Sequence, residues 1–278
     1  MLVRQQELPR HPAGAQAPPL RFTMIRWQSE AIWEAVAPLL AGFTVEVLPE
    51  IDSTNSELMR RARAGRTEPV LLVGERQTAG RGRLGRAWLS APGDSLTFSL
   101  GLEMAPADWA GLSLAVGVSV AESLDPAVRL KWPNDLWLQD RKLGGILIET
   151  ASFGDGAAAA RYAVIGIGIN VAPRSAAGLA TPPACVRDLL PQADAPGVLE
   201  RLAAPLVRDL LGFAQAGFRP FHARFDARDA LRDRPVSLSD GTVGTAHGVS
   251  ESGALLVHTA AGLRPVASSE VSVRPAAS

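Results

Sequence analysis

The alternation of hydrophobic and polar positions divides the chain into short helices and strands. Apolar residues at helical spacing predict helices over residues 29–40, 54–63, 112–123 and 197–216. Alternating or continuous apolar runs predict strands over 44–48, 70–75, 95–102, 128–132 and 162–171, and a hairpin formed by 136–139 and 143–149. These elements together predict a mixed α/β domain.

Polar residues and prolines indicate how some of these helices begin and end. Thr54 and Glu57 have the spacing of a capping box, which predicts a helix that begins there and ends at Gly65. Taken alone, Ser53 and Thr54 need no role beyond capping. Pro38 is expected to disturb the first helix and Pro205 to kink the last one, because proline cannot donate a helical hydrogen bond.

The C-terminal part of the chain has a different pattern. From Arg234 on, short strands alternate with turn sequences, which is typical of a small β-barrel. The predicted organisation is a main domain over 24–230 followed by the barrel over 231–278. Residues 1–23 are rich in Pro, Ala and Arg and are predicted to be a disordered extension, so Met24 is a candidate start of the folded protein.

Composition and charge narrow the class of protein. Hydrophobic residues make up 47% of the 278 residues, enough for a sizeable core, and Lys+Arg and Asp+Glu each number 28, so no basic excess favours nucleic acid. The only cysteine, Cys185, excludes an internal disulfide and suits a reducing compartment. No apolar run reaches the roughly 18 residues of a membrane span and no signal peptide is visible, which predicts a cytoplasmic location.

The stretch from Gly80 to Trp88, called the arginine loop below, combines three glycines with three arginines. Glycine lets a backbone pass close to a ligand, and arginine supplies a fixed fork of donors for carboxylate or phosphate oxygens. Such a loop is expected to close over an anionic small molecule. The alternative is a solvated basic turn.

The glycines of this loop also match G-x-G-x-x-G, the dinucleotide-binding fingerprint. That fingerprint requires a helix to begin within the glycines, so that its N-terminus faces the pyrophosphate. Residues 88–94 have turn composition instead and lead into the strand predicted over 95–102. The dinucleotide-binding interpretation is therefore rejected.

Further clusters accompany the loop: 52–55, Gln77, Lys-Trp-Pro-Asn-Asp at 131–135, Lys-Leu-Gly-Gly at 142–145, and Gly-Ile-Gly-Ile-Asn at 166–170. In this order and spacing they resemble the biotin protein ligases over about residues 45–275, in the form without an N-terminal DNA-binding domain. The resemblance implies a mixed sheet with flanking helices of the class II synthetase type, followed by an SH3-like barrel.

The resemblance also implies a two-step reaction. ATP activates the carboxylate of biotin as biotinyl-5′-AMP and releases diphosphate, and a lysine of the biotin carboxyl carrier protein of a carboxylase then displaces AMP. Both steps need positioning and neutralisation of negative charge more than a protein nucleophile. ATP and Mg²⁺ are the implied cofactors.

By matching position, the resemblance places Ser53, Thr54, Asn55 and Gln77 around the biotin head group and Arg81, Gly82 and Arg83 in a loop that orders over the adenylate. It places Lys142 near the biotin carboxylate and α-phosphate, Lys131 near the phosphates, and Asn134 and Asp135 at Mg²⁺ or the attacking lysine. Lys131, Lys142 and Arg83 are the implied catalytic residues. The remaining implied binding residues are Gly80, Arg86, Trp88, Gly144, Gly145, Gly168 and Asn170. The alternative for the two lysines is a pair of exposed strand-end side chains.

The sequence departs from the family pattern in three places. Residues 171–186 contain no aromatic residue, which leaves the adenine contact unassigned; Ser269 stands where a glycine is expected; and too few residues precede Asp52 for a winged helix. A biotin-responsive DNA-binding regulator is therefore disfavoured, and a lipoate–protein ligase is the rival within acyl transfer. A homodimer is compatible with the resemblance, but the sequence leaves the oligomeric state open.

Overall fold

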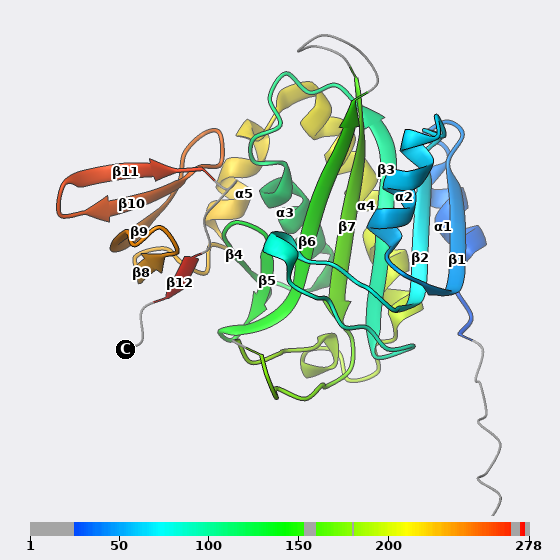
Figure 1. Cartoon of the computed structure of the whole chain (residues 1–278), viewed down its shortest axis with the longest axis horizontal. Helices are drawn as coiled ribbons and strands as arrows, with labels where there is room; N and C mark the ends of the chain where they lie inside the picture. Colours follow the sequence, from blue (N-terminus) through cyan, green and yellow to red (C-terminus); the bar gives the residue numbers. More distant parts are fainter. Residues whose placement is uncertain (1–24, 153–159, 180, 268–272, 276–278) are drawn as a thin grey trace, which may run out of the picture.

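The computed structural model describes residues 25–152, 160–179, 181–267 and 273–275, so the predicted N-terminal extension and Ser269 lie outside the described residues. A seven-stranded sheet forms its centre, in the order β1-β2-β3-β7-β6-β5-β4 (Figure 1). The strands are β1 (Thr44–Ile51), β2 (Val70–Gln77), β3 (Ser95–Met104), β4 (Arg129–Lys131), β5 (Asp135–Leu138), β6 (Arg141–Ser152) and β7 (Arg161–Asn170). Only β1 and β2 pair in parallel, and the other neighbours are antiparallel, so the sheet is mixed as expected.

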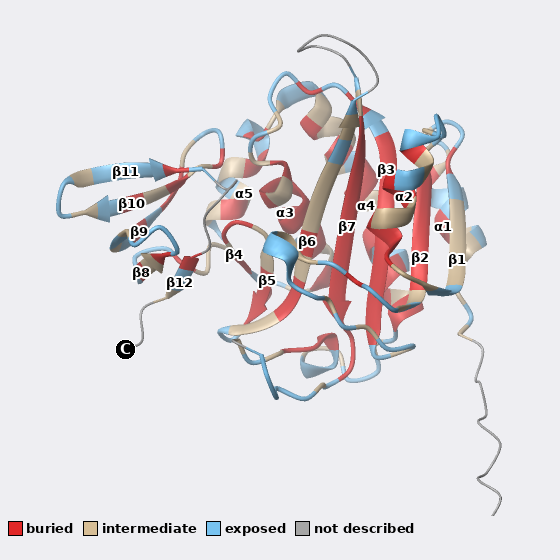
Figure 2. Ribbon diagram, viewed as in Figure 1, coloured by how far each residue is buried: buried red, intermediate tan, exposed pale blue. Residues whose placement is uncertain are grey.

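Helices cover both faces of this sheet. The larger apolar cluster joins the sheet to α1 (Ser29–Val36), α3 (Leu112–Leu124) and α4 (Ala195–Ala216), whereas α2 (Thr54–Arg63) packs on the opposite face in a second cluster (Figure 1). Side chains of α2, including Leu58 and Met59, meet Leu72 of β2 and Tyr162 of β7 there. Figure 2 shows that the central strands β2, β3 and β7 are almost entirely buried between these two layers.

The helix ends differ in detail from the predicted ones. α1 ends at Val36, before Pro38, so the predicted extension to residue 40 was wrong. α2 has the predicted span, but its N-cap is Ser53, whose side chain accepts a hydrogen bond from the Ser56 backbone N–H. Capping by Ser53 is thereby confirmed, whereas Thr54 is the first helical residue, so the capping box predicted between Thr54 and Glu57 was wrong. α4 continues through Pro205 as one helix.

A smaller antiparallel sheet follows the main domain. Its five strands are arranged β11-β10-β9-β8-β12, with bounds β8 (Pro235–Leu238), β9 (Val243–Val249), β10 (Leu255–Thr259), β11 (Gly262–Val266) and β12 (Val273–Pro275). A short 3₁₀ turn (Arg219–Phe221) and α5 (His222–Asp226) precede it. No helix among the described residues is both long enough and apolar enough to cross a membrane.

This smaller sheet is attached to the part of the main sheet that carries the Lys-Trp-Pro-Asn-Asp sequence. Leu130 of β4 donates its backbone N–H to Arg228 and accepts from Ala230, so the connecting segment runs beside β4. The buried Trp132 side chain donates to the Gly253 carbonyl in the turn between β9 and β10, at 3.1 Å. The connecting segment thus contacts β4, and the C-terminal module (residues 231–275) contacts the residue that directly follows β4.

Candidate active site

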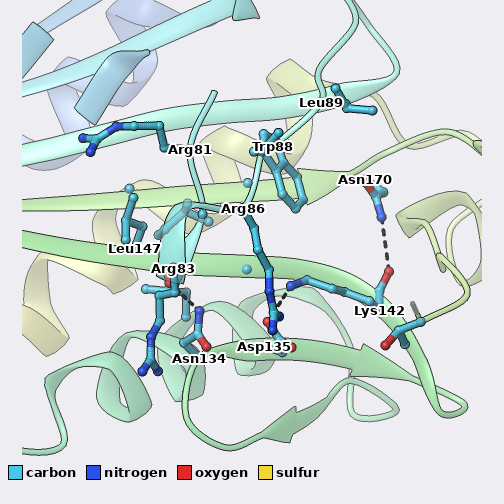
Figure 3. Close-up of a pocket in the computed structure, with 18 of the residues that line it drawn as sticks. Arg81, Arg83, Arg86, Trp88, Leu89, Asn134, Asp135, Lys142, Leu147 and Asn170 are labelled. Atoms are coloured by element: carbon cyan, nitrogen blue, oxygen red, sulfur yellow. Dashed lines mark hydrogen bonds and ion pairs between the residues drawn. The ribbon is translucent and has the colours of Figure 1, made fainter. Parts of the chain in front are cut away.

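The clusters singled out in the sequence converge on one cavity of about 680 Å³, which lies between the arginine loop and strands β5, β6 and β7 (Figure 3). The predicted residues that line it are Ser53, Thr54, Asn55, Gln77, Arg81, Gly82, Arg83, Arg86, Trp88, Lys131, Asn134, Asp135, Lys142, Gly145, Gly168 and Asn170. Gly80 and Gly144 are the two predicted residues outside this lining. Each is packed so closely against neighbouring backbone that a side chain would not fit.

The arginine loop is a closed, hairpin-like turn. Trp88 donates its backbone N–H to the Gly80 carbonyl at 2.8 Å, and Gly82 donates to the Arg86 carbonyl at 2.7 Å. A single 3₁₀ turn at Arg83–Gly85 forms the tip, and no α-helix begins there. The rejection of the dinucleotide-binding interpretation is thereby confirmed.

The glycines of β7 leave space for two side chains of the site. A Cβ at Gly168 would lie 2.6 Å from Cζ2 of Trp88, and a Cβ at Gly166 would overlap the Asn55 side chain. Trp88 and Asn55 can therefore rest directly on the sheet. The close backbone approach expected from the Gly-Ile-Gly-Ile-Asn sequence is confirmed.

One end of the cavity is neutral and polar. The side-chain oxygen Oε1 of Gln77 accepts from the Thr54 backbone N–H at 2.8 Å, and the Thr54 hydroxyl lies 2.7 Å from that of Ser99. Ser99 in turn donates to the Asn55 side-chain oxygen at 2.6 Å. Ser99 is fully buried in β3 and was missed in the sequence, where it is one polar position in an alternating strand. Neutral donors and acceptors of this kind suit an uncharged polar ring.

The other end of the cavity carries the two lysines, both held by one carboxylate. Lys142 Nζ lies 2.6 Å from one oxygen of Asp135, and Lys131 Nζ lies 3.6 Å from the other. The Lys131 side chain is only 12% exposed. Its burial lowers the pKa of Lys131, while the charge of Asp135 opposes that shift. The Lys142 side chain is 31% exposed, so neither lysine is a fully solvated strand-end side chain.

Asn170 supports this end of the cavity through the backbone of Lys142. Its side-chain nitrogen donates to the backbone carbonyls of Lys142 and Ala184, at 3.2 and 2.9 Å (Figure 3). Arg174 donates to the Asn170 side-chain oxygen and to the Leu89 carbonyl, and it therefore connects the end of β7 to the segment that leaves the arginine loop. Through these contacts Asn170 positions the backbone of Lys142.

Protein groups contact both predicted magnesium ligands, but the Asn134 contact is made by its amide nitrogen and not by the oxygen that would bind a metal. The Asn134 side-chain nitrogen donates to the Ile146 carbonyl at 2.8 Å, and both oxygens of Asp135 face lysines. Among the described residues, no three His, Cys, Asp or Glu side chains gather as a metal site would require. Magnesium usually keeps several waters and binds one or two carboxylates together with substrate phosphates. The described residues therefore do not fit a magnesium site formed by the protein alone.

The charge of the cavity is strongly positive. Among the described residues, its lining contains one carboxylate, that of Asp135, and seven cationic side chains: Arg81, Arg83, Arg86, Lys131, Lys142, Arg174 and Arg274. Burial lowers the pKa of Arg83. Figure 3 shows Arg86 and Lys142 directed toward Asp135, whereas Arg81 extends to the opposite side of the loop. Such a surface favours an anionic ligand.

Arg274 was missed in the sequence because it lies in β12 of the C-terminal module, far along the chain from the other clusters. The loop after β7 also contributes, and Leu179 lies at the cavity although 41% of it is exposed. Two separate sheets thus build the walls of the cavity.

Known families match both parts of the chain. Residues 47–170 match the biotin/lipoate A/B protein ligase family, and residues 234–274 match the biotin protein ligase C-terminal domain. The bifunctional ligase/repressor BirA of Escherichia coli is 39% identical over 251 residues, which are 85% of this chain and 76% of that protein. The biotin–[acetyl-CoA-carboxylase] ligase of Paracoccus denitrificans is 33% identical over 81% of this chain and 98% of its own.

A solved structure agrees with these sequence matches. The biotin protein ligase from Aquifex aeolicus in complex with biotin and ATP superposes with a TM-score of 0.70 at 30% identity, over 84% of this chain and 99% of that one. The mixed sheet and the small C-terminal sheet therefore have counterparts in a structure that aligns along most of both chains. This chain belongs to the biotin protein ligase family.

Proposed function

We propose that the protein is an ATP-dependent biotin–protein ligase, which forms biotinyl-5′-AMP and then transfers biotin to a lysine of a biotin carboxyl carrier protein. The observation that carries the proposal is a single cavity with a neutral polar end and a cationic end. Biotin has the same two parts, an uncharged ureido ring and a terminal carboxylate. The two named relatives and the Aquifex aeolicus complex support the choice of substrates.

In the first step, the polar end lined by Thr54 and Gln77 binds the biotin ring and directs the carboxylate toward Lys142. Ser99 is buried behind this end and orients the Thr54 hydroxyl. The carboxylate oxygen attacks the α-phosphorus of ATP, and the bond to diphosphate breaks. Lys131, Lys142 and Arg86 offset the negative charge that builds on the phosphates, in a cavity where that charge is partly shielded from water. Asp135 keeps both ammonium groups at fixed positions before ATP arrives.

In the second step, the amine of the acceptor lysine attacks the carbonyl carbon of the mixed anhydride and AMP leaves. The arginine loop keeps the adenylate away from water until the acceptor approaches. Because Asp135 already holds Lys142 and Lys131, we assign it to positioning these cations rather than to binding an ion. Magnesium belongs to the proposal only as the ion that accompanies the phosphates of ATP.

Exchange of diphosphate into ATP tests the activating step. The reaction should depend on biotin and should fail with lipoate or octanoate. Exchange with lipoate instead would contradict the choice of acid and favour the lipoate-ligase rival, and no exchange with any of the three would contradict adenylation altogether. A carrier protein whose acceptor lysine is replaced by arginine controls the transfer step, since it should accept no biotin.

Lys142→Ala tests the cationic end in the same assay. Exchange should be abolished while the thermal unfolding transition remains cooperative, because the substitution removes the ammonium group nearest the expected carboxylate and leaves the fold intact. Normal turnover of this variant would remove Lys142 from the site.

A further inference from the structure

Glu149 connects two parts of the site without lining the cavity. It lies in β6, and one of its carboxylate oxygens accepts hydrogen bonds from two side chains of different elements. Arg81 of the arginine loop lies at 2.7 Å and Asn55 of α2 at 2.9 Å. Neither the residue nor its spacing stood out in the sequence.

The Asn55 side of this connection is rigid. Asn55 is 4% exposed, and its nitrogen also donates to the Leu147 carbonyl at 3.1 Å. Its oxygen accepts from Ser99, which leads on to the hydroxyl of Thr54. The orientation of the Asn55 amide is therefore set from three directions, and Glu149 is one of them.

Arg81, the other partner of Glu149, lies in the arginine loop, which would have to open to release biotinyl-adenylate. The Arg81 backbone pairs with Ala87 across the loop, and its side chain, 44% exposed, reaches from the loop to β6. Its ion pair with Glu149 joins the loop to the main sheet. Since charge-assisted hydrogen bonds are stronger than neutral ones, this contact favours the closed loop.

We propose that Glu149 is a positioning residue that holds the arginine loop closed through Arg81. The same carboxylate also orients Asn55, so loop closure and the polar end of the cavity depend on one residue. The inference rests on the proposed function, because the closed loop matters there by retaining biotinyl-adenylate. Loss of the ion pair then speeds adenylate release by about 5- to 30-fold, the factor that one or two kcal/mol produces.

An ordinary surface ion pair would have a much smaller effect. The comparison within this chain is Arg76–Glu50, which has a similar separation of 2.8 Å but side chains that are 58% and 55% exposed. Glu149 is only 26% exposed and shares its oxygen with a buried amide. The same substitution at Glu50 and at Glu149 therefore separates a general effect of lost charge from the effect proposed here.

Glu149→Gln is the test variant, because glutamine can still accept from Asn55 while it loses the charge that attracts Arg81. Each protein is loaded with biotin and ATP, freed of excess ligand, and followed for release of biotinyl-adenylate. Release of biotinyl-adenylate from Glu149→Gln should be about 5- to 30-fold faster than from the unmodified protein. This fold-change should exceed the fold-decrease in the maximal rate of diphosphate exchange. Glu50→Gln should release the adenylate at the rate of the unmodified protein. Equal release from all three proteins would overturn the proposal.

Arg81→Met and the double variant complete a mutant cycle. If the two groups act through each other, Arg81→Met should release adenylate faster, and Glu149→Gln should add little to it. Fully additive effects of the two substitutions would overturn the proposed coupling.

Limited tryptic digestion without ligand gives a readout that does not depend on biotin chemistry. Glu149→Gln should be cut faster after the arginines of the loop than Glu50→Gln, as followed by mass spectrometry. Cutting at the same rate would contradict the proposed role of Glu149. If the unmodified protein lacks biotin-dependent exchange but this difference in cutting is found, the proposed function fails while the loop contact stands.

Discussion

Gly168→Ala is the substitution whose effect can be worked out most directly from the structure. The added Cβ would lie 2.6 Å from Cζ2 of Trp88 and 2.8 Å from its Nε1, and real Cβ atoms essentially never approach other heavy atoms within 3.0 Å. Gly168 lies inside β7, between Thr97 of β3 and Gly145 of β6, where alanine meets no conformational restriction. The indole must therefore withdraw by about 1 Å to regain a normal carbon contact.

The free-energy cost of this shift is expected to fall on the arginine loop. Overpacking of this size costs about 1–3 kcal/mol, and the tryptophan backbone closes the loop through its 2.8 Å hydrogen bond to Gly80. The central strands are fixed by ladders on both sides, so the loop is the part that gives way. Affinity for biotin should therefore fall by roughly 5- to 150-fold.

Calorimetric titration with biotin measures this loss, and urea unfolding measures the stability of the whole protein. Gly212→Ala in α4 is the matched control, because its added Cβ would meet no atom within 4 Å. In a helix this change should stabilise the protein by roughly 0.5–1 kcal/mol without altering biotin binding. Undiminished affinity in Gly168→Ala would refute the packing role given to Trp88.

Three further substitutions test other parts of the structure. Asp135→Asn removes the carboxylate that holds both lysines, so the pKa of Lys131 should fall further. The free energy of unfolding should drop by about 1–3 kcal/mol, which is less than for a fully buried ion pair. An unchanged urea midpoint would contradict this expectation. Burial raises the pKa of Asp229 from 3.8 to about 6, so the folded state binds more protons than the unfolded state between these values and stability falls as pH rises through them. Asp229→Asn should remove this pH dependence and raise the free energy of unfolding by up to about 3 kcal/mol at neutral pH. If urea unfolding shows the same change of stability with pH in both proteins, Asp229 is not its source. Ser53→Ala removes the N-cap of α2 and should cost about 0.5–1 kcal/mol, because its 3.4 Å hydrogen bond is long; a thermal midpoint equal to that of the unmodified protein would show that the cap is not formed.

The sequence by itself determined the elements and the family. Apolar periodicity located the strands, because burial on a sheet leaves a period that can be read locally. The order of the glycine, arginine and lysine clusters indicated the biotin protein ligases, and the relatives that align along most of both chains agree. The glycines of β7 also indicated close approach in advance, since a strand interior loses packing at a glycine unless another group fills the space.

Only the tertiary structure decided how these parts act on one another. The contacts of Glu149 join residues 68 and 94 positions apart, and Trp132 meets Gly253 across 121 positions. Local patterns carry information over a few residues, so they indicate that a polar side chain exists but not which partner satisfies it. Asp135 illustrates the difference: the sequence offered it for Mg²⁺ or for orienting the attacking lysine, and the structure adds that two ammonium groups of the protein face its oxygens. Its partners lie only four and seven positions away, and the antiparallel pairing of β4 with β5 and of β5 with β6 is what brings both lysines to that carboxylate.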